Sequence, residues 1–251
     1  MRRTFPLPRP LALALAIAGA SWAAAAAPAA RLDLQYGLCS APAEVQRALA
    51  LEPHGKPIEV WLFDNAALDL MNRGLRIRLR GSAGKSQELT LKIADQDCAK
   101  LPPLPRGEGK CEYDSHGAKI AGALSLEGRV SASRAGALLA GKLAVADVLT
   151  PRQVSALQAI PGVWPLPGDL RALGPTRVRA YRSADKAYQV DISDLPGGEQ
   201  YIEISRKVAL ADAEPARQRF EADLARSGVE VCADQSAQAV NKLRALLRLA
   251  R

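Results

Sequence analysis

Three arginines, Arg76, Arg78 and Arg80, occupy alternate positions in the run 75–80. Alternate side chains of a β-strand point to the same face, so this run predicts a strand with guanidinium groups on one face and leucine or isoleucine on the other. Each guanidinium can donate to two oxygens of a phosphate group, so such a row is suited to binding a polyanion. Three like charges also repel one another, so the row needs either water or counter-charges in front of it.

Two neighbouring runs must position this row. Residues 58–64 and 88–93 also alternate, and the second includes Lys92 among its polar positions. The turn at 81–86 contains two glycines, a lysine and a serine, which superficially resembles a phosphate-binding loop. Only two residues separate its glycines and a strand follows it, so a hairpin turn is predicted instead.

The rest of the chain adds more two-faced strands and several amphipathic helices. Alternation predicts strands at 31–36, 111–114, 119–126, 177–181, 188–192 and 201–207. Helical periodicity predicts helices at 42–51, 130–145, 150–160, 215–226 and 236–249. Two interpretations of the arginine row remain open. It is either the solvated outer face of an ordinary sheet, or the inner face of a barrel whose apolar outside is covered by helices.

Residues 1–26 are predicted to be a signal peptide. Arg2, Arg3 and Arg9 precede the apolar run 11–18 and an alanine tract that offers A-x-A cleavage sites, and cleavage after Ala26 is expected. The apolar run is short for a membrane span and no second span follows, so a periplasmic or secreted protein with no membrane span after cleavage is predicted. Removing three arginines leaves 31 basic and 26 acidic residues, which lowers the net charge from +8 to +5.

Four cysteines lie in the predicted mature part of the chain: Cys39, Cys98, Cys111 and Cys232. An even number of cysteines in an exported chain predicts disulfide bonds, here two. Four cysteines allow three pairings, and we favour Cys98 with Cys111, which closes a proline-rich loop, together with Cys39 with Cys232. No zinc site is predicted, because no pair has C-x-x-C spacing and each of the two histidines precedes a glycine in a predicted loop.

The order of the motifs along the chain resembles a known family. The motifs are Phe63-Asp64-Asn65, Arg73-Gly74-Leu75-Arg76-Ile77-Arg78, Leu89-Thr90-Leu91-Lys92, Arg177-Val178-Arg179, Asp191, Gly198 and Ile202-Glu203-Ile204. Together they resemble the CYTH domains of the triphosphate tunnel metalloenzymes, over nearly the whole mature chain and as a single domain at 31–250. The resemblance implies an α+β fold: an antiparallel eight-stranded β-barrel that forms a tunnel with a charged interior, with amphipathic helices packed outside. It favours the charged-interior interpretation.

The resemblance also implies which residues line the tunnel. The anion-binding candidates are Arg76, Arg78, Arg80, Lys92, Arg177 and Arg179. The candidates for binding a divalent metal, Mg or Mn, are the carboxylates Asp33, Asp191 and Glu203. The family's first strand reads E-x-E-x-K and its last strand E-x-E. This chain has Gln35 and Ser205 at two of the carboxylate positions and Gly37 in place of the lysine, so its anion-binding groups are better preserved than its metal-binding groups.

Two functions are expected from these features. The leading one is an exported barrel protein that binds a phosphorylated or otherwise polyanionic ligand with little or no catalysis. The alternative is a divalent-metal-dependent hydrolase of tripolyphosphate or of an organic triphosphate. The sequence argues against nucleic-acid binding, because aromatic residues make up only 4% of the chain and the basic residues alternate with acidic ones.

Overall fold

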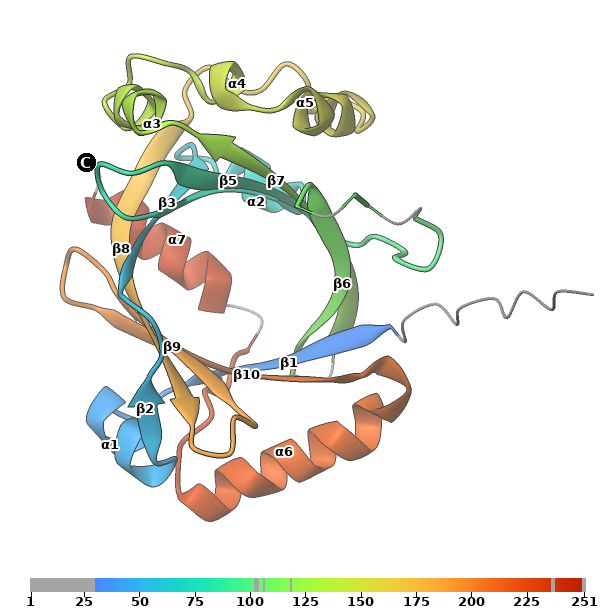
Figure 1. Ribbon diagram of the computed structural model, residues 1–251, viewed down its shortest axis with the longest axis vertical. Coiled ribbons are helices and arrows are strands. Elements are labelled where there is room, and N and C mark those ends of the chain that lie inside the picture. Colours follow the sequence, from blue (N-terminus) through green and yellow to red (C-terminus); the bar gives the residue numbers. More distant parts are fainter. Residues whose placement is uncertain (1–29, 102–103, 106, 118, 236–237, 250–251) are drawn as a thin grey trace, which may run out of the picture.

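The structure is a computed structural model that describes residues 30–101, 104–105, 107–117, 119–235 and 238–249. The predicted signal peptide, 1–26, lies outside the described residues. Figure 1 looks along the axis of a ring of β-strands, with helices on its outer side and one helix across its opening. None of the described helices is both long and apolar enough to cross a membrane.

Nine of the described strands close into a barrel, in the order β8, β3, β4, β5, β7, β6, β1, β10, β9 and back to β8. They are β1 (Arg31–Leu38), β3 (Ile58–Asp64), β4 (Leu75–Gly81), β5 (Gln87–Ile93), β6 (Gly109–His116), β7 (Lys119–Val130), β8 (Arg171–Ser183), β9 (Gln189–Asp194) and β10 (Gln200–Ala209). A short strand, β2 (Leu51–Pro53), pairs with β8 outside the barrel. The predicted α+β barrel is confirmed, and every run predicted to be a strand lies in it.

The barrel has one strand more than the resemblance implied, and it is mixed rather than fully antiparallel. β1 and β6 run parallel, whereas the other eight neighbouring pairs are antiparallel. The odd strand count explains this pairing. Strand directions cannot alternate all the way around a closed ring of nine, so one pair must be parallel.

The helices flank the barrel. They are α1 (Pro42–Ala48), α2 (Asp69–Asn72), α3 (Ala132–Leu139), α4 (Val145–Val148), α5 (Pro151–Gln158), α6 (Ala213–Ser227) and α7 (Gln238–Leu249), with a 3₁₀ turn at Leu210–Asp212. The helix predicted at 130–145 is shorter in the structure, where α3 ends at Leu139 and α4 begins only at Val145. Gly141 adopts a φ of +69° and its N–H donates to the carbonyl of Leu138, which ends α3. The helix predicted at 42–51 ends early, where β2 begins, and α2 was not predicted.

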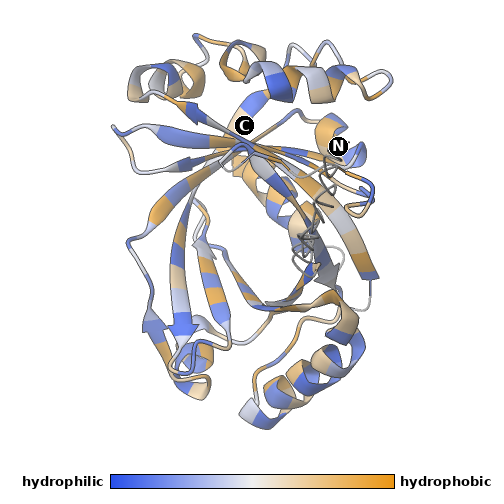
Figure 2. Ribbon diagram, turned by 45° about the vertical axis from the view of Figure 1, so that its right-hand side comes forward, coloured by the Kyte–Doolittle hydropathy of each residue, from blue (hydrophilic) through white to orange (hydrophobic). Residues whose placement is uncertain are grey.

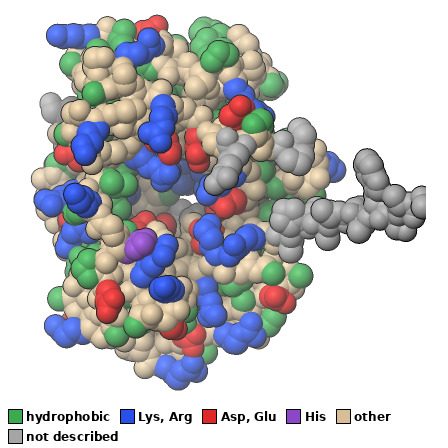
Figure 3. All heavy atoms as spheres, viewed as in Figure 1, with side chains coloured by type: hydrophobic (Ala, Val, Ile, Leu, Met, Phe, Trp, Pro, Cys, Tyr) green, Lys and Arg blue, Asp and Glu red, His purple; other side chains and the backbone are tan. Residues whose placement is uncertain are grey.

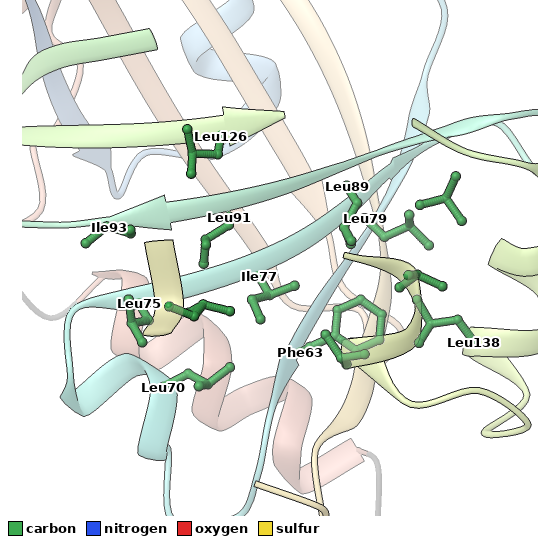
Figure 4. Close-up of a cluster of buried hydrophobic side chains, with 14 of the residues drawn as sticks. Phe63, Leu70, Leu75, Ile77, Leu79, Leu89, Leu91, Ile93, Leu126 and Leu138 are labelled. Carbon is green, nitrogen blue, oxygen red and sulfur yellow. The ribbon is translucent and has the colours of Figure 1, made fainter. Parts of the chain in front are cut away.

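The outer face of the arginine strand is buried under α3, α4 and α5. Leu75, Ile77 and Leu79 of β4 are 1%, 0% and 0% exposed, and they pack with β5, β7 and the helices in one apolar cluster (Figure 4). Alternating polar and apolar bands along the strands are visible in Figure 2. Because the apolar row of β4 faces the helices, its arginine row must face the inside of the barrel. The charged-interior interpretation is therefore correct for this strand.

Helix α5 is fixed to the barrel by a buried side chain. Gln153 is 0% exposed and its Nε2 donates to the carbonyl oxygens of Leu89 (3.1 Å) and Leu126 (3.0 Å), on β5 and β7. Thr150 caps the helix by accepting from the N–H of Gln153. A Cβ at Gly128 of β7 would lie 2.6 Å from the methyl group of Thr150, so the glycine allows this close approach.

A second apolar cluster lies on the opposite side of the barrel, where α1 and α6 cover β1, β9 and β10. Phe220 of α6 is fully buried between Tyr36 and Tyr188, with ring centroids 5.4 Å and 5.2 Å away. The third cluster joins α7 to the barrel through Leu243, Leu246 and Leu173. Helices therefore pack against the barrel through three apolar clusters.

Both predicted disulfide bonds are present in the structure. Cys39 is joined to Cys232 across 193 residues, and Cys98 to Cys111 across 13 residues. The first bond connects the region after β1 to the segment that leads into α7. The second connects β6 to the loop after β5.

Candidate functional site

A cavity of about 410 Å³ lies inside the barrel and receives charged side chains from several strands and from α7. Its basic lining residues are Arg76, Arg78, Arg80, Lys92, Lys110, Lys207 and Lys242. Its acidic lining residues are Asp33, Glu112, Asp114, Asp191 and Glu203. Figure 3 shows the hollow in the middle of the face, with basic and acidic side chains around it. Seven basic and five acidic side chains give the lining a net charge of +2.

Two of the predicted anion-binding residues are unpaired inside this cavity. Within the described residues, Arg76 and Arg78 have no ion pair and no hydrogen bond, and Arg78 Nε is buried without a partner. Burial is the main cause that lowers the pKa of both guanidinium groups. Arginine stays protonated despite such a shift, so the inner wall holds two poorly solvated positive charges. An anion in the cavity would supply the acceptors that these two groups lack.

The other predicted residues of this wall are already paired. Arg80 forms an ion pair with Glu88 at 2.8 Å, and Lys92 forms one with Asp114 of β6. Both basic residues line the cavity, as predicted. Their charges are partly offset by the carboxylates, so they contribute less attraction for an anion than Arg76 and Arg78 do.

Arg177 and Arg179 do not line the cavity, and the prediction that they point into the tunnel is wrong. The residue between them, Val178, lines it and lies opposite Ser193, which also lines it. Arg179 lies on the outer face, where its Nε and Nη2 each donate to Asp194 at 2.9 Å. The predicted alternation of this run is present, but its two faces are the reverse of the prediction. Alternation alone cannot tell which face is inside.

Lys242 of α7 is a cavity residue outside the set predicted from the sequence. Its Nζ donates to Ser193 Oγ at 2.8 Å, and burial lowers its pKa, while the charges of Glu203 and Asp191 act in the opposite direction. A signal was available: Lys242 stands at helical spacing with Ala239 and Leu246, on an otherwise apolar stripe. A lysine in such a stripe either reaches the surface along the helix or faces a polar interior, and here it faces the cavity.

Asp191 and Glu203 form an acidic pair on the floor of the cavity. They lie opposite each other on β9 and β10, and among the described residues neither forms an ion pair. The side chain of Glu203 has accessible surface inside the cavity, but the barrel surrounds it, so its carboxylate is poorly solvated. Burial, followed by the negative charge of Asp191, raises the pKa of Glu203. Burial is also the largest cause that raises the pKa of Asp191.

Comparisons with known proteins support the fold. No family model and no curated protein matches the sequence. Among solved structures, the chain is similar to a protein of Hippeastrum described as a candidate adenylyl cyclase with a dominant triphosphatase activity. The two are 19% identical with a TM-score of 0.54, and the match covers 87% of this chain and 95% of that one. It is also similar to a candidate adenylate cyclase of Bacillus halodurans, at 14% identity and a TM-score of 0.52, over 83% and 97%. The chain therefore shares the barrel fold of these two proteins.

The tunnel departs from the pattern of the family that the sequence resembles at the position of the missing lysine. Gly37 lines the tunnel, and a Cβ built on it would lie 2.9 Å from Cγ of Gln238 on α7. The side chain of Gln235 accepts from the N–H of Gly37 at 2.6 Å and donates to its carbonyl oxygen at 3.1 Å. The space of a first-strand lysine is thus filled by two glutamines of the C-terminal segment. The basic residue that α7 contributes to the tunnel lining is Lys242.

The arrangement of the tunnel carboxylates is unfavourable for a Mg or Mn centre. In the part of the chain that the structure describes, no three His, Cys, Asp or Glu side chains come close enough together to hold a metal ion. Asp33 Oδ2 lies 3.2 Å from Lys207 Nζ, so an ammonium group already stands beside this carboxylate. A hard divalent cation prefers several oxygen ligands, and a neighbouring ammonium opposes its binding. That Asp33, Asp191 or Glu203 binds metal remains a prediction from the sequence.

Proposed function

We propose that this protein binds a triphosphate or a similar polyanion in its tunnel, with little or no turnover. The observation that carries the proposal is the pair Arg76 and Arg78, which face the cavity with no partner among the described residues. A protein does not usually leave buried charges uncompensated, because the cost of desolvation is high. A phosphate group would supply the missing acceptors and form bidentate bonds with both guanidinium groups.

The setting of the protein is part of the same proposal. A signal peptide at 1–26, a single CYTH-like domain at 31–250 and a location in the periplasm or outside the cell are expected from the sequence. The two disulfide bonds support an oxidising compartment. The ligand is then a phosphorylated or otherwise polyanionic small molecule that occurs outside the cytoplasm.

Tripolyphosphate is the probe that tests the proposal. We expect isothermal titration calorimetry of the mature protein to show binding of tripolyphosphate, and we expect raising the salt from low to high concentration to weaken it by roughly tenfold, because ions screen charge attraction at the tunnel mouth. Orthophosphate, with fewer charges, is the control and should bind more weakly. Absence of tripolyphosphate binding at low salt would contradict the proposal.

The second candidate function is a metal-dependent triphosphate hydrolase. Two observations favour it: Asp191 and Glu203 have no ion-pair partner among the described residues, and the similar Hippeastrum protein is described as a triphosphatase. In such an enzyme, the arginines would hold the phosphates and the carboxylates would hold a cation that offsets charge as it develops. The arrangement of the carboxylates described above argues against this candidate.

The substitution Glu203→Gln separates the two functions. If the tunnel only binds an anion, removing one negative charge strengthens tripolyphosphate binding, by about fivefold for roughly 1 kcal/mol of repulsion relieved in a partly screened interior. If Glu203 is a metal ligand, the same change weakens binding in the presence of magnesium and removes hydrolysis. Calorimetry with and without magnesium, together with a phosphate-release assay, measures both. Tyr201→Phe, on the same strand and lining the same cavity, keeps the charge and is the matched control.

A further inference from the structure

The part of the tunnel wall formed by β1, β6 and β10 carries its own positive charges. Asp33 and Lys207 lie directly opposite each other on β1 and β10, and their charged groups are 3.2 Å apart. The same ammonium group lies 3.4 Å from Glu112 Oε1 on β6. Lys207 therefore joins carboxylates from two strands that neighbour each other in the barrel, β1 and β6.

The neighbouring carboxylates are matched with lysines as well. Lys110 forms an ion pair with the other oxygen of Glu112 at 2.6 Å, and Lys92 forms an ion pair with Asp114, which lies beside Asp33 in the β1–β6 register. All of these side chains line the tunnel. Three lysines thus face three carboxylates, and this part of the wall is neutral without any added cation.

The two neighbouring carboxylates keep Lys207 charged. Burial alone would lower its pKa, but the negative charges of Asp33 and Glu112 outweigh that effect and raise it. The ammonium group is therefore protonated over the whole range in which proteins work. The free oxygen of Asp33, Oδ1, is buried and has no hydrogen-bond partner. A divalent cation at that oxygen would stand close to the ammonium group and would be repelled by it.

We infer that Lys207 is a built-in cation that takes the place of a divalent metal between Asp33 and Glu112, so that the tunnel binds polyanions without metal. This inference rests on the proposed function, and it adds that no Mg or Mn is needed for affinity. Lys207 is a positioning residue: its ammonium group neutralises two carboxylates that would otherwise repel an anion held by Arg76 and Arg78. A lysine in this role differs from a metal because chelators cannot remove it.

Two measurements test the inference. In the first, tripolyphosphate is titrated into the wild-type protein in EDTA and again in magnesium; we expect binding in EDTA that magnesium does not strengthen. In the second, Mn²⁺ alone is titrated and followed by electron paramagnetic resonance, with no polyphosphate present. We expect no saturable Mn²⁺ binding by the wild type, and new Mn²⁺ binding by Lys207→Met and Lys207→Gln, because Asp33 and Glu112 lose their shared cation.

Lys110→Met is the matched control, since it removes a lysine from the same wall but leaves Lys207 between the two carboxylates. It should not gain Mn²⁺ binding. We also expect Lys207→Met to weaken tripolyphosphate binding in EDTA at least tenfold and to regain part of it when Mn²⁺ is added; thermal unfolding checks that each variant is folded.

The outcomes separate this inference from the proposed function. Wild-type binding of tripolyphosphate only in magnesium would overturn the built-in cation but leave the anion-binding tunnel in place. Failure to bind tripolyphosphate in either condition would overturn the proposed function, and the Mn²⁺ measurement would still decide whether Lys207 takes the place of a metal between Asp33 and Glu112. Saturable Mn²⁺ binding by the wild type that is lost in Asp33→Asn would overturn it, as would unchanged Mn²⁺ behaviour in both Lys207 variants.

Discussion

Replacing Arg78 with alanine should weaken tripolyphosphate binding by about 10- to 150-fold, which corresponds to the roughly 1.5 to 3 kcal/mol of a charged hydrogen bond. Arg76→Ala should have an effect of similar size. Both guanidinium groups face the tunnel, and neither has a partner in the described residues that could compete for it. Their full hydrogen-bonding capacity is therefore available to the ligand. Calorimetry at low salt measures the loss directly.

The same substitutions should not destabilise the fold. Arg78 contributes no ion pair within the described chain, and its burial opposes its charge, as the lowered pKa indicates. Removing a poorly solvated, unpaired charge relieves a desolvation cost, so the melting temperature of Arg78→Ala should stay the same or rise. A variant that loses affinity and also unfolds would instead indicate a structural role for the arginine.

Arg177→Ala is the matched control for these two variants. Arg177 is an exposed arginine on a strand of the same barrel, on the face opposite to the tunnel, although its sequence pattern matches that of the anion-binding residues. We expect its removal to leave tripolyphosphate affinity within about twofold of the wild type, since exposed charges outside a site have small effects at moderate salt. Equal losses at Arg76, Arg78 and Arg177 would mean that binding follows net charge and not the tunnel.

The sequence was sufficient to predict the barrel wall at β4 because local and global signals agree there. The apolar row Leu75, Ile77 and Leu79 needs a cover, and the chain supplies amphipathic helices to provide it. The arginine row is then forced inward. No comparable signal orients β8, where Arg177 and Arg179 alternate with Val178 and Ala180, which suit either face.

The orientation of β8 depends on features far from it in the sequence. The register between β3 and β8 shifts between Val60 and Leu62, next to Gly174 and Pro175. Such a shift exchanges the faces of everything beyond it, and it depends on a partner strand more than 100 residues away. The parallel pairing of β1 and β6 could not be predicted from local sequence either, because it depends on the number of strands that close the whole barrel.

The ion pairs within the tunnel also could not be predicted from the sequence. Lys92 was predicted to face the tunnel and does, but its partner Asp114 comes from a strand on the other side of β7. Lys242 lies on α7, the last helix, and the alternation that orients strands gives no information on where a helix packs. Composition gave only the near balance of basic and acidic residues, whereas the structure shows which charges cancel locally and which remain free.

The disulfide between Cys39 and Cys232 should be the most stabilising single link in the chain. In the chain-entropy model, it contributes about 5 kcal/mol for its separation of 193 residues, and Cys98–Cys111 contributes about 3 kcal/mol for its 13 residues. We expect the double variant Cys39→Ser, Cys232→Ser to lower the free energy of unfolding by more than Cys98→Ser, Cys111→Ser does. Urea unfolding without reductant measures both, and each variant serves as the control for the other.

The two double variants should also differ in anion binding, because only one of the bonds fixes a wall of the tunnel. Cys232 lies ten residues before Lys242, and Gln235, which lies between them in the sequence, is hydrogen-bonded to Gly37 of β1. Without the Cys39–Cys232 bond, α7 is held by its apolar contacts and by Lys242 with Ser193. We therefore expect that variant to bind tripolyphosphate several-fold more weakly under conditions where it is still folded. The reason is that binding must then also order Lys242, which costs free energy. The Cys98–Cys111 variant should keep the wild-type affinity, and equal affinities in both variants would mean that the bond stabilises the fold without holding α7 in the tunnel.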